Sequence, residues 1–225
     1  MSQPQTVESP GGPQPGRVER RRARVRQRIL EVVEKLTEAR GIDDVTIDDI
    51  AEAADVARRT FYHYFESKHD VLVPIARART RALNRRIDRS VENVDDPAEL
   101  IAIALRHTLR SMPEDPLCAW FIFRSGLPQQ RLLEVIGESG QRDVGRGLQS
   151  GRFAIANPAA VRSLLSGAVI GALSGRLEGA LDDVDLDDAV EYLLRLLGVP
   201  SAEAKEIAHR PLPPLVASPG AASPS

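Results

Sequence analysis

Residues 46–68 read TIDDIAEAADVARRTFYHYFESK, and this order predicts two short helices joined by a tight turn. Thr46, followed three residues later by Asp49, is typical of a capping box, in which each side chain bonds the other residue's backbone N–H. Apolar side chains then recur at helical spacing, at Ile47, Ile50, Ala51 and Ala54. Residues 55–57 supply the turn that ends this first helix.

The second helix of the pair is expected over residues 58–65, where Phe61 and Phe65 lie four positions apart and face inward. The side chains left outside can contact phosphates and base edges: Arg58, Arg59, Thr60, Tyr62 and His63. A second capping box, from Ser67 to Asp70, begins a third helix. Lys68 lies in its first turn, where the positive end of the helix dipole favours a phosphate. We interpret the stretch as a DNA-binding helix-turn-helix.

The segments TIDDIA at 46–51 and TFYHYFESK at 60–68 resemble the TetR family of bacterial repressors, and the resemblance extends over residues 29–72. It implies an all-α homodimer. An N-terminal three-helix helix-turn-helix domain would bind DNA, and a C-terminal helical bundle would bind an effector and the partner subunit. The DNA-binding residues expected from the motif are Arg24, Thr46, Arg58, Arg59, Thr60, Tyr62, His63, Tyr64 and Lys68.

Three positions depart from the pattern of this family. Asp55 replaces the usual Gly of the turn, and Asp adopts left-handed backbone conformations more readily than most residues. Ala57 replaces the usual Ser cap of the recognition helix, at a cost of about 1 kcal/mol. Thr37 replaces a core Phe of the first helix. These departures affect local stability, and none of them removes a group that contacts DNA.

Charge is segregated along the chain. The 225 residues carry a net charge of −2 and are 42% hydrophobic, so the overall balance does not by itself indicate a polyanionic partner. Residues 17–28, RVERRRARVRQR, are nevertheless strongly basic, with Glu19 as their one acid. Beside a helix-turn-helix, this pattern favours contact with phosphates or the minor groove over a merely solvated face. The single cysteine, Cys118, excludes an internal disulfide and a cysteine metal site.

We expect four parts along the chain. Residues 1–16 are polar, rich in Pro and Gly, unlike a signal peptide, and expected to be disordered. Residues 17–66 form the DNA-binding domain, and residues 67–200 form the ligand-binding and dimerisation domain. Residues 201–225 are expected to be a mostly disordered tail after a short helix over 201–209.

Helix boundaries are expected from caps and stops. The first helix runs over residues 18–40 and stops at Gly41, and the helix after Ser67 runs to about residue 91. Its arginines are interpreted as a solvated face. Asp-Pro pairs at 96–97 and 115–116 begin two more helices, the first of which ends before Pro113. Further helices are expected over 129–151, after Asn157, and over 186–197 with Asp185 as the cap.

A row of small residues, Ser163, Gly167, Gly171, Gly175 and Gly179, recurs at four-residue spacing in the helix after Asn157. Interior glycine costs up to about 1 kcal/mol relative to Ala, so a partner helix packed very close is the natural compensation. A membrane crossing is disfavoured, because only residues 163–175 lie between charges and about 20 are needed. The dimer interface is expected at Gly167, Gly171, Gly175, Leu193 and Leu197.

The effector site is expected between the helix that begins at residue 97 and the apolar helix that follows Asp115. Aromatic rings, two polar groups and an adaptable Met could line one cavity for a mostly apolar molecule, which could be anionic if Arg110 points inward. The alternative is that these aromatics only fill the core. The expected ligand-binding residues are His107, Arg110, Met112, Trp120, Phe121 and Phe123.

Catalytic and metal sites find no support in the sequence. The four histidines have no partner at helical spacing suited to a metal, and neither a Walker A pattern nor a dinucleotide fingerprint occurs. Cys118 lies in an apolar stretch without a neighbouring His, which favours an inert core thiol. No cofactor, catalytic residue or metal ligand is therefore expected. The alternative to a regulator is a helical small-molecule binder or enzyme whose helix-turn-helix is only structural.

The expected mechanism is a two-state equilibrium in the cytoplasm. A small-molecule effector moves the long helix after Ser67 and changes the separation of the two recognition helices in the homodimer. Binding to a double-stranded, palindromic operator with fixed half-site spacing then weakens. No role at a membrane is expected.

Overall fold

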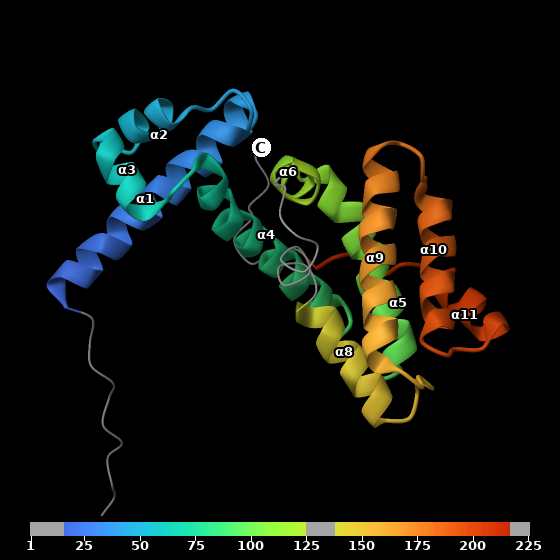
Figure 1. Ribbon diagram of the computed structural model, residues 1–225. Coiled ribbons are helices and arrows are strands. Elements are labelled where there is room, and N and C mark those ends of the chain that lie inside the picture. Colours follow the sequence, from blue (N-terminus) through green and yellow to red (C-terminus); the bar gives the residue numbers. More distant parts are fainter. Residues whose placement is uncertain (1–15, 125–137, 217–225) are drawn as a thin grey trace, which may run out of the picture.

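The computed structural model describes residues 16–124 and 138–216, and every regular element in these ranges is an α-helix. The N-terminal group is α1 (Arg17–Arg40), α2 (Ile47–Ala53), α3 (Arg58–Tyr64) and the long α4 (Lys68–Ser90). The second group is α5 (Pro97–Glu114), α6 (Pro116–Arg124), α8 (Glu138–Gln149), α9 (Pro158–Leu177), α10 (Asp183–Leu196) and α11 (Ser201–Ala208). Figure 1 shows α4 leading from the first group to the second. The all-α prediction is confirmed.

The helix-turn-helix has the local geometry that the caps predict. The backbone N–H of Thr46 donates to Asp49 Oδ2 at 2.9 Å, and the N–H of Asp49 donates to the Thr46 hydroxyl at 3.2 Å. Asp55 in the turn has a φ of 54°, the left-handed conformation expected where Gly usually stands. Ala57 caps α3 without a side-chain bond. Thr37, buried in α1, satisfies its hydroxyl by donating to the carbonyl of Val33 at 2.8 Å.

Two predicted helix ends are wrong. α5 continues through Pro113 to Glu114, because a proline in the last turn removes a single N–H and the chain can still complete that turn. α10 begins earlier than predicted, since Asp182 is its N-cap and Asp185 is the third helical residue that completes the capping box. The predicted helix over 129–151 appears as α8, and its part over 129–137 lies outside the described residues.

The N-terminal core extends beyond the helix-turn-helix. Ile29 and Phe61 are fully buried in it, and α4 adds Leu72 from its first turns. α6 contributes Trp120 and Phe121 to the same core. The predicted DNA-binding unit is thus packed directly against α4 and α6, which carry it on the second group of helices (Figure 1).

Arg79 of α4 joins three helices by ion pairs. Its guanidinium contacts Glu34 at 2.8 Å and also Glu38, both on α1, and it contacts Asp115 at the start of α6 at 2.9 Å. The expected solvated face of α4 is therefore wrong at this position, where the side chain is only 22% exposed.

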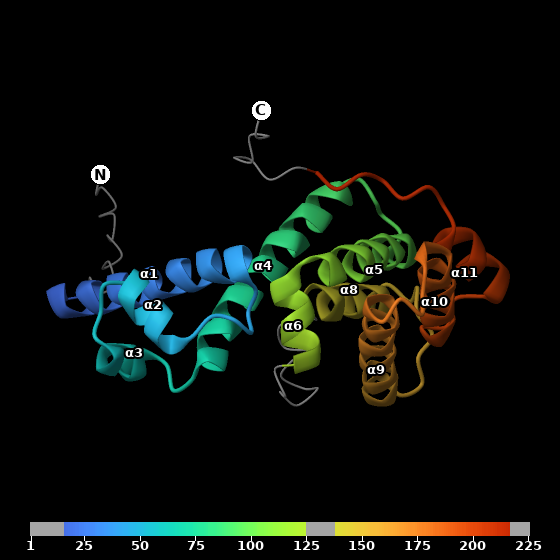
Figure 2. The same cartoon turned by 90° about the horizontal axis from the view of Figure 1, so that it is seen from above.

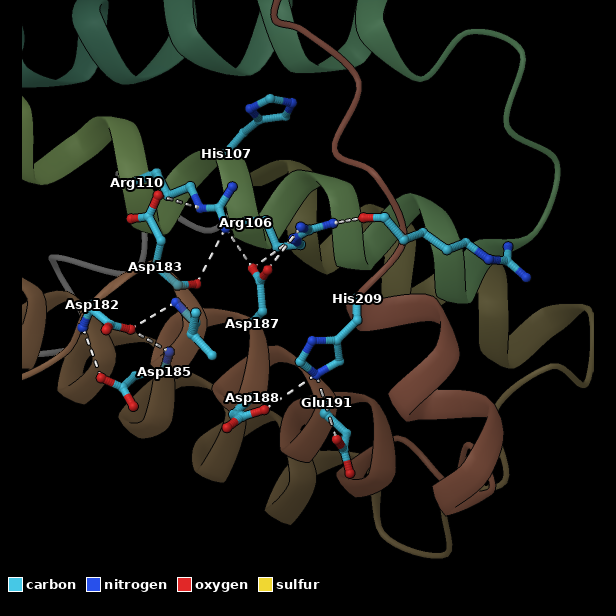
Figure 3. A network of polar contacts seen from close by, with 12 residues as sticks. Arg106, His107, Arg110, Asp182, Asp183, Asp185, Asp187, Asp188, Glu191 and His209 are labelled. Carbon is cyan, nitrogen blue, oxygen red and sulfur yellow. Dashed lines mark hydrogen bonds and ion pairs between the residues drawn. The ribbon is translucent and has the colours of Figure 1, made fainter.

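The second core lies among α5, α9, α10 and α11, around side chains such as Leu173, Leu186 and Leu194. A buried arginine, Arg106 of α5, crosses this layer to α10. Its Nε and Nη2 donate to the two carboxylate oxygens of Asp187 at 2.7 and 2.9 Å (Figure 3). The bidentate pair fixes the orientation of α10 on α5.

Residues 211–216 run from α11 back across α5 to the last turn of α4 (Figure 2). On α5, the ring Nε2 of His107 lies 2.9 Å from the carbonyl oxygen of Pro213. On α4, the hydroxyl oxygen of Ser90 accepts the N–H of Val216 at 3.1 Å. The prediction of a disordered tail is therefore wrong for these residues, while residues 1–15 and 217–225 lie outside the described ranges.

Candidate DNA interface and effector cavity

The recognition helix α3 presents a polar face. Phe61 is fully buried beneath it, whereas Arg58, Arg59 and His63 are exposed and Tyr62 is 45% exposed. The guanidinium carbon of Arg58 lies 5.9 Å from the centre of the Tyr62 ring. These side chains can reach base edges and phosphates without any rearrangement of the core.

The basic end of α1 contacts α3. Nη2 of Arg22 lies 3.1 Å from Nε2 of His63, and the guanidinium carbon of Arg26 lies 5.1 Å from the centre of the Phe65 ring. Arg24 is exposed on the same helix. Helix α1 therefore adds positive charge to the recognition surface. Arg22 was missed as an individual residue, although its place in the basic run of 17–28 was the available signal.

A cavity of about 270 Å³ lies among α4, α5, α8 and α9. Much of its lining is apolar: Ile87, Ile101, Leu105, Val144, Leu165 and Val169. Its polar lining consists of Asn84, Asp88, Thr108, Gln141, Asp143, Arg162 and Ser166. A concave, mostly apolar site with a few polar groups is the usual form of a small-molecule site.

Helix α4 takes part in both the DNA-binding unit and the cavity. Its first half places Val71 and Ile75 in the N-terminal core, and its second half places Ile87 and Val91 in the cavity wall. A change of shape in the cavity therefore bears on the same helix that supports α2 and α3.

Two family models match the chain. The model described as bacterial regulatory proteins of the tetR family matches residues 29–74, and the tetracyclin repressor-like C-terminal domain matches residues 96–210. The chain belongs to the TetR family. The family resemblance inferred from the helix-turn-helix is thus confirmed, and the second match covers α5, α8 and α9, three of the four helices around the cavity.

Solved structures share the fold. RolR in complex with its ligand resorcinol has a TM-score of 0.78 and 32% identity, covering 88% of this TetR-family chain and 99% of RolR. Thermus thermophilus FadR in complex with lauroyl-CoA has a TM-score of 0.58 and 20% identity, covering 76% of this chain and 92% of FadR. At 20% identity, the similarity to FadR shows only that the two proteins share a fold.

Curated relatives match over a shorter stretch. An uncharacterised HTH-type transcriptional regulator of Mycobacterium tuberculosis H37Rv is 35% identical over 95 residues, which are 42% of this chain and 47% of that protein. The regulator EthR of Mycolicibacterium smegmatis is 29% identical over 92 residues, covering 40% of this chain and 42% of EthR. The chain thus spans about half the length, or less, of these curated relatives.

The six residues predicted to bind the effector do not line the cavity among α4, α5, α8 and α9 of this TetR-family chain. Arg110 pairs with Asp187 at 2.9 Å and so points to α10 (Figure 3). Trp120 packs against His69, with ring centres 5.0 Å apart, and it lies with Phe121 in the N-terminal core. The expectation of one shared space around these side chains is corrected, because each of these three already has partners elsewhere in the protein.

The other three also lie apart from that cavity. His107 is buried against Pro213 of the tail, and burial lowers the pKa of its imidazole because the charged form loses hydration. Phe123 is 39% exposed. Met112 lines a separate cavity of about 250 Å³ beside Cys118. Burial raises the pKa of the Cys118 thiol to about 12, in keeping with the expected inert thiol.

The residues predicted for the dimer interface fall into two groups. Gly167 and Gly171 are exposed on α9, and a Cβ added at Gly171 would meet no atom of the protomer within 4 Å. At Gly175 an added Cβ would lie 2.8 Å from the Leu181 side chain of the same chain, so this glycine serves packing within the protomer. Leu193 and Leu197 are likewise buried within the protomer. The prediction that Leu193 and Leu197 contact a partner subunit is corrected, because other parts of the same protomer already cover both side chains.

A histidine and two carboxylates come together at the junction of α10 and α11. His209 Nε2 lies 3.2 Å from Asp188 Oδ1 and 3.9 Å from Glu191 Oε2 (Figure 3). Among the described residues, this is the one group whose donor atoms lie close enough to share a metal ion. Sequence spacing could not show it, because the histidine comes from another helix. The same geometry is that of an ion-pair network. Arg195 also belongs to this network, because its Nη1 lies 3.7 Å from Glu191 Oε1.

Lys68 has a role in the protomer that the sequence did not show. Its Nζ donates to the carbonyl oxygens of Ile42 at 2.8 Å and Val45 at 2.9 Å, in the loop between α1 and α2. The hydroxyl of Thr46 is also engaged, with Asp49. These two side chains therefore hold the α1–α2 loop, and the prediction that they contact DNA stays a prediction.

Lys68→Met should lower the free energy of unfolding by about 1 to 3 kcal/mol, since two carbonyl oxygens lose a charged donor. Urea unfolding followed by circular dichroism measures this change. Lys35→Met, which removes an exposed lysine of α1, should leave the midpoint unchanged. An unchanged midpoint for Lys68→Met, together with weaker DNA binding, would show instead that Lys68 serves mainly as a phosphate contact.

Proposed function

We propose that this TetR-family chain is a cytoplasmic repressor that binds a palindromic DNA site as a homodimer. It releases that site when a small, mostly apolar molecule occupies the cavity among α4, α5, α8 and α9. The observation that carries the proposal is the position of α4, which belongs to the core under α3 and also to the wall of the cavity. Filling the cavity favours one placement of α4, and the spacing of two recognition helices changes with it.

The DNA-binding half of the proposal rests on the exposed side chains of α3. A helix-turn-helix that served only as packing would have no need of Arg59 and Tyr62 on its outer face, where both are exposed. Arg22 and His63 bring α1 into the same surface. We expect α3 to enter the major groove and the basic part of α1 to lie along the phosphates.

The homodimer is supported by one face of α9. Ser163, Leu164, Gly167, Ala168 and Gly171 are all exposed in the protomer and recur at helical spacing. Helix α10 lies beside α9 and exposes Val184 and Tyr192 (Figure 1). An apolar surface spread over two adjacent helices is typical of a subunit interface.

Among the described helices, α9 is also the one that has the length and mean hydropathy, 1.2, of a possible membrane span. Arg162 and Arg176 lie inside it and leave residues 163–175 between them, where about 20 apolar residues are needed. A second copy of the chain is therefore the proposed occupant of this face.

The effector is proposed to be a small molecule because the cavity is small and its lining mostly apolar. RolR, which is similar over nearly its whole length, is recorded in complex with resorcinol. Resorcinol is accordingly the first compound to test on this chain.

The test begins with operator DNA selected from a random library. Operator binding is then followed by fluorescence anisotropy while candidate compounds are added. Ala104→Phe, which places a ring in the cavity, should abolish release by any true effector and keep DNA binding. Ala82→Phe is the matched control, since it fills the separate cavity beside Met112. Release that survives Ala104→Phe unchanged would place the effector site elsewhere, and failure to select any DNA would overturn the regulatory proposal.

A further inference from the structure

Asp143 is an unusual member of the cavity wall. It is 4% exposed, on a helix whose inward face also carries Val144, Gly147 and Leu148. Among residues 16–124 and 138–216, the ion-pair partner shown for it is Arg142, whose Nε lies 3.5 Å from Asp143 Oδ1. The Arg142 side chain is 57% exposed. Within the described residues, the buried carboxylate is thus held by one long ion-pair contact to a largely solvated guanidinium.

Such a carboxylate is costly to the fold unless something else bonds it. A buried ionised group needs good hydrogen bonds to offset the loss of hydration, and a single contact at 3.5 Å does not supply them. Burial also raises the pKa of Asp143, with Asp88 acting in the same direction and Arg142 and Arg146 opposing it. A molecule that enters the cavity and donates hydrogen bonds to the Asp143 carboxylate would offset this cost.

A second acceptor, Asp88 of α4, lies close to Asp143. Nη2 of Arg142 bonds Asp88 Oδ1 at 3.2 Å, so one guanidinium contacts a carboxylate from α4 and a carboxylate from α8. Asp88 and Asp143 both line the cavity. A ligand that donates to both would bridge α8 to α4, the helix that supports the DNA-binding unit.

The charges around Asp143 decide which donors fit. Two carboxylates oppose an anionic ligand, while Arg142, Arg146 and the cavity-lining Arg162 oppose a cationic one. A neutral hydroxyl group donates a hydrogen bond without adding charge. The volume of about 270 Å³ and the apolar remainder of the wall suit a single ring.

We propose that Asp143, with Asp88 as a second acceptor, selects small neutral rings that carry hydroxyl groups as the effectors of this protein. The inference rests on the proposed function and specifies the chemistry of the same cavity. Asp143 is retained for recognition at the expense of stability, so its removal affects the fold and the ligand response in opposite directions.

The test compares wild type, Asp143→Asn and Asp143→Leu, with Asp95→Leu as a control that removes an exposed carboxylate. The probes are phenol and the three dihydroxybenzenes, their methyl ethers, benzoate and benzylamine. Binding is measured by calorimetry, and operator release by anisotropy. Wild type should bind the hydroxylated rings at least about tenfold more tightly than their methyl ethers and than the charged probes. A difference of this size is expected when a hydrogen bond to a charged group is lost. Asp143→Leu should remove that difference, and Asp143→Asn should reduce it.

Thermal unfolding separates recognition from a structural role. Asp143→Leu should raise the melting temperature by about 2 to 5 °C, because a buried carboxylate with one long ion-pair contact to Arg142 is replaced by an apolar side chain beside free volume. A fall in melting temperature for both Asp143 variants would overturn the inference, since it would make Asp143 a structural residue. Equal binding of hydroxylated and methylated rings to wild type would also overturn it.

The two proposals fail in different ways. If a compound without donors releases the operator, is blocked by Ala104→Phe and keeps its potency with Asp143→Leu, the ligand class is wrong and the cavity remains the effector site. If hydroxylated rings release the operator equally well from Ala104→Phe and from wild type, the assignment of the cavity itself is wrong.

Discussion

Asp187→Ala is expected to lower the free energy of unfolding by about 3 to 5 kcal/mol and the melting temperature by about 10 °C. The reason is Arg106, which is 5% exposed and donates to both oxygens of Asp187. Arg110 donates to the same carboxylate at 2.9 Å (Figure 3). Removing the Asp187 carboxylate leaves the charge of the buried Arg106 guanidinium uncompensated. The main hydrogen bond left to this guanidinium is the one that it donates to the carbonyl oxygen of Arg210 at 2.6 Å.

Two further variants separate this cause from a general loss of packing. Asp183→Ala removes a carboxylate that is 57% exposed and pairs with Arg110 and Arg176, so its effect should stay below about 1 kcal/mol. The double variant Arg106→Leu with Asp187→Leu should recover much of the loss, because no charge is left buried. A double variant as unstable as Asp187→Ala would contradict the assignment of the loss to an unpaired charge.

Gly171→Leu is expected to yield a folded protomer that no longer dimerises and that binds operator DNA about 100-fold or more weakly. Within the protomer there is open space at this position, so the added side chain should not lower the melting temperature of the monomer. On the face that includes Leu164 and Gly167, it would hold two α9 helices apart. A monomer contacts one half-site at a time, and the gain from joining two binding events is lost.

Sedimentation velocity and operator titrations measure the two effects on the same samples. Ala202→Leu places the same side chain on the exposed surface of α11 and should leave both unchanged. Gly175→Leu should act differently, since its side chain would meet Leu181 of the same chain and destabilise the protomer. A Gly171→Leu protein that sediments as an intact dimer would refute the proposed face.

The parts of the fold that the sequence predicted depend on residues close together in the chain. The cap formed by Thr46 and Asp49 spans three residues, and the conformation of Asp55 depends on its own backbone. Arg79 and Glu34, by contrast, are 45 residues apart, and periodicity along α4 cannot show that they meet. The same limit applies to Lys68, whose acceptors Ile42 and Val45 lie in an earlier loop.

The six residues predicted to bind the effector do not meet around one cavity, because their prediction took aromatic content as a guide to a cavity. Trp120 and Phe121 instead fill the core where α6 meets the DNA-binding unit. A better signal was present in the sequence at Asp143, a charged residue at the same helical spacing as Val144 and Gly147. An acidic side chain on the inward face of an amphipathic helix needs a partner, and here the cavity lies beside it.

The C-terminal segment ties the last turn of α4 to the rest of the protomer. With 23 residues, α4 is about 35 Å long, and residues 211–216 bind its last turn through Ser90. A rigid helix that is fixed at its C-terminal end moves mostly at its N-terminal end. A rotation of about 5° about the held end would displace the first turn of α4 by about 3 Å, which is a large shift for the attached α3 if α3 is to fit the major groove. Val91, beside the held end, lines the cavity, so in the proposed mechanism a small movement at Val91 becomes a larger one at the end of α4 that carries α3.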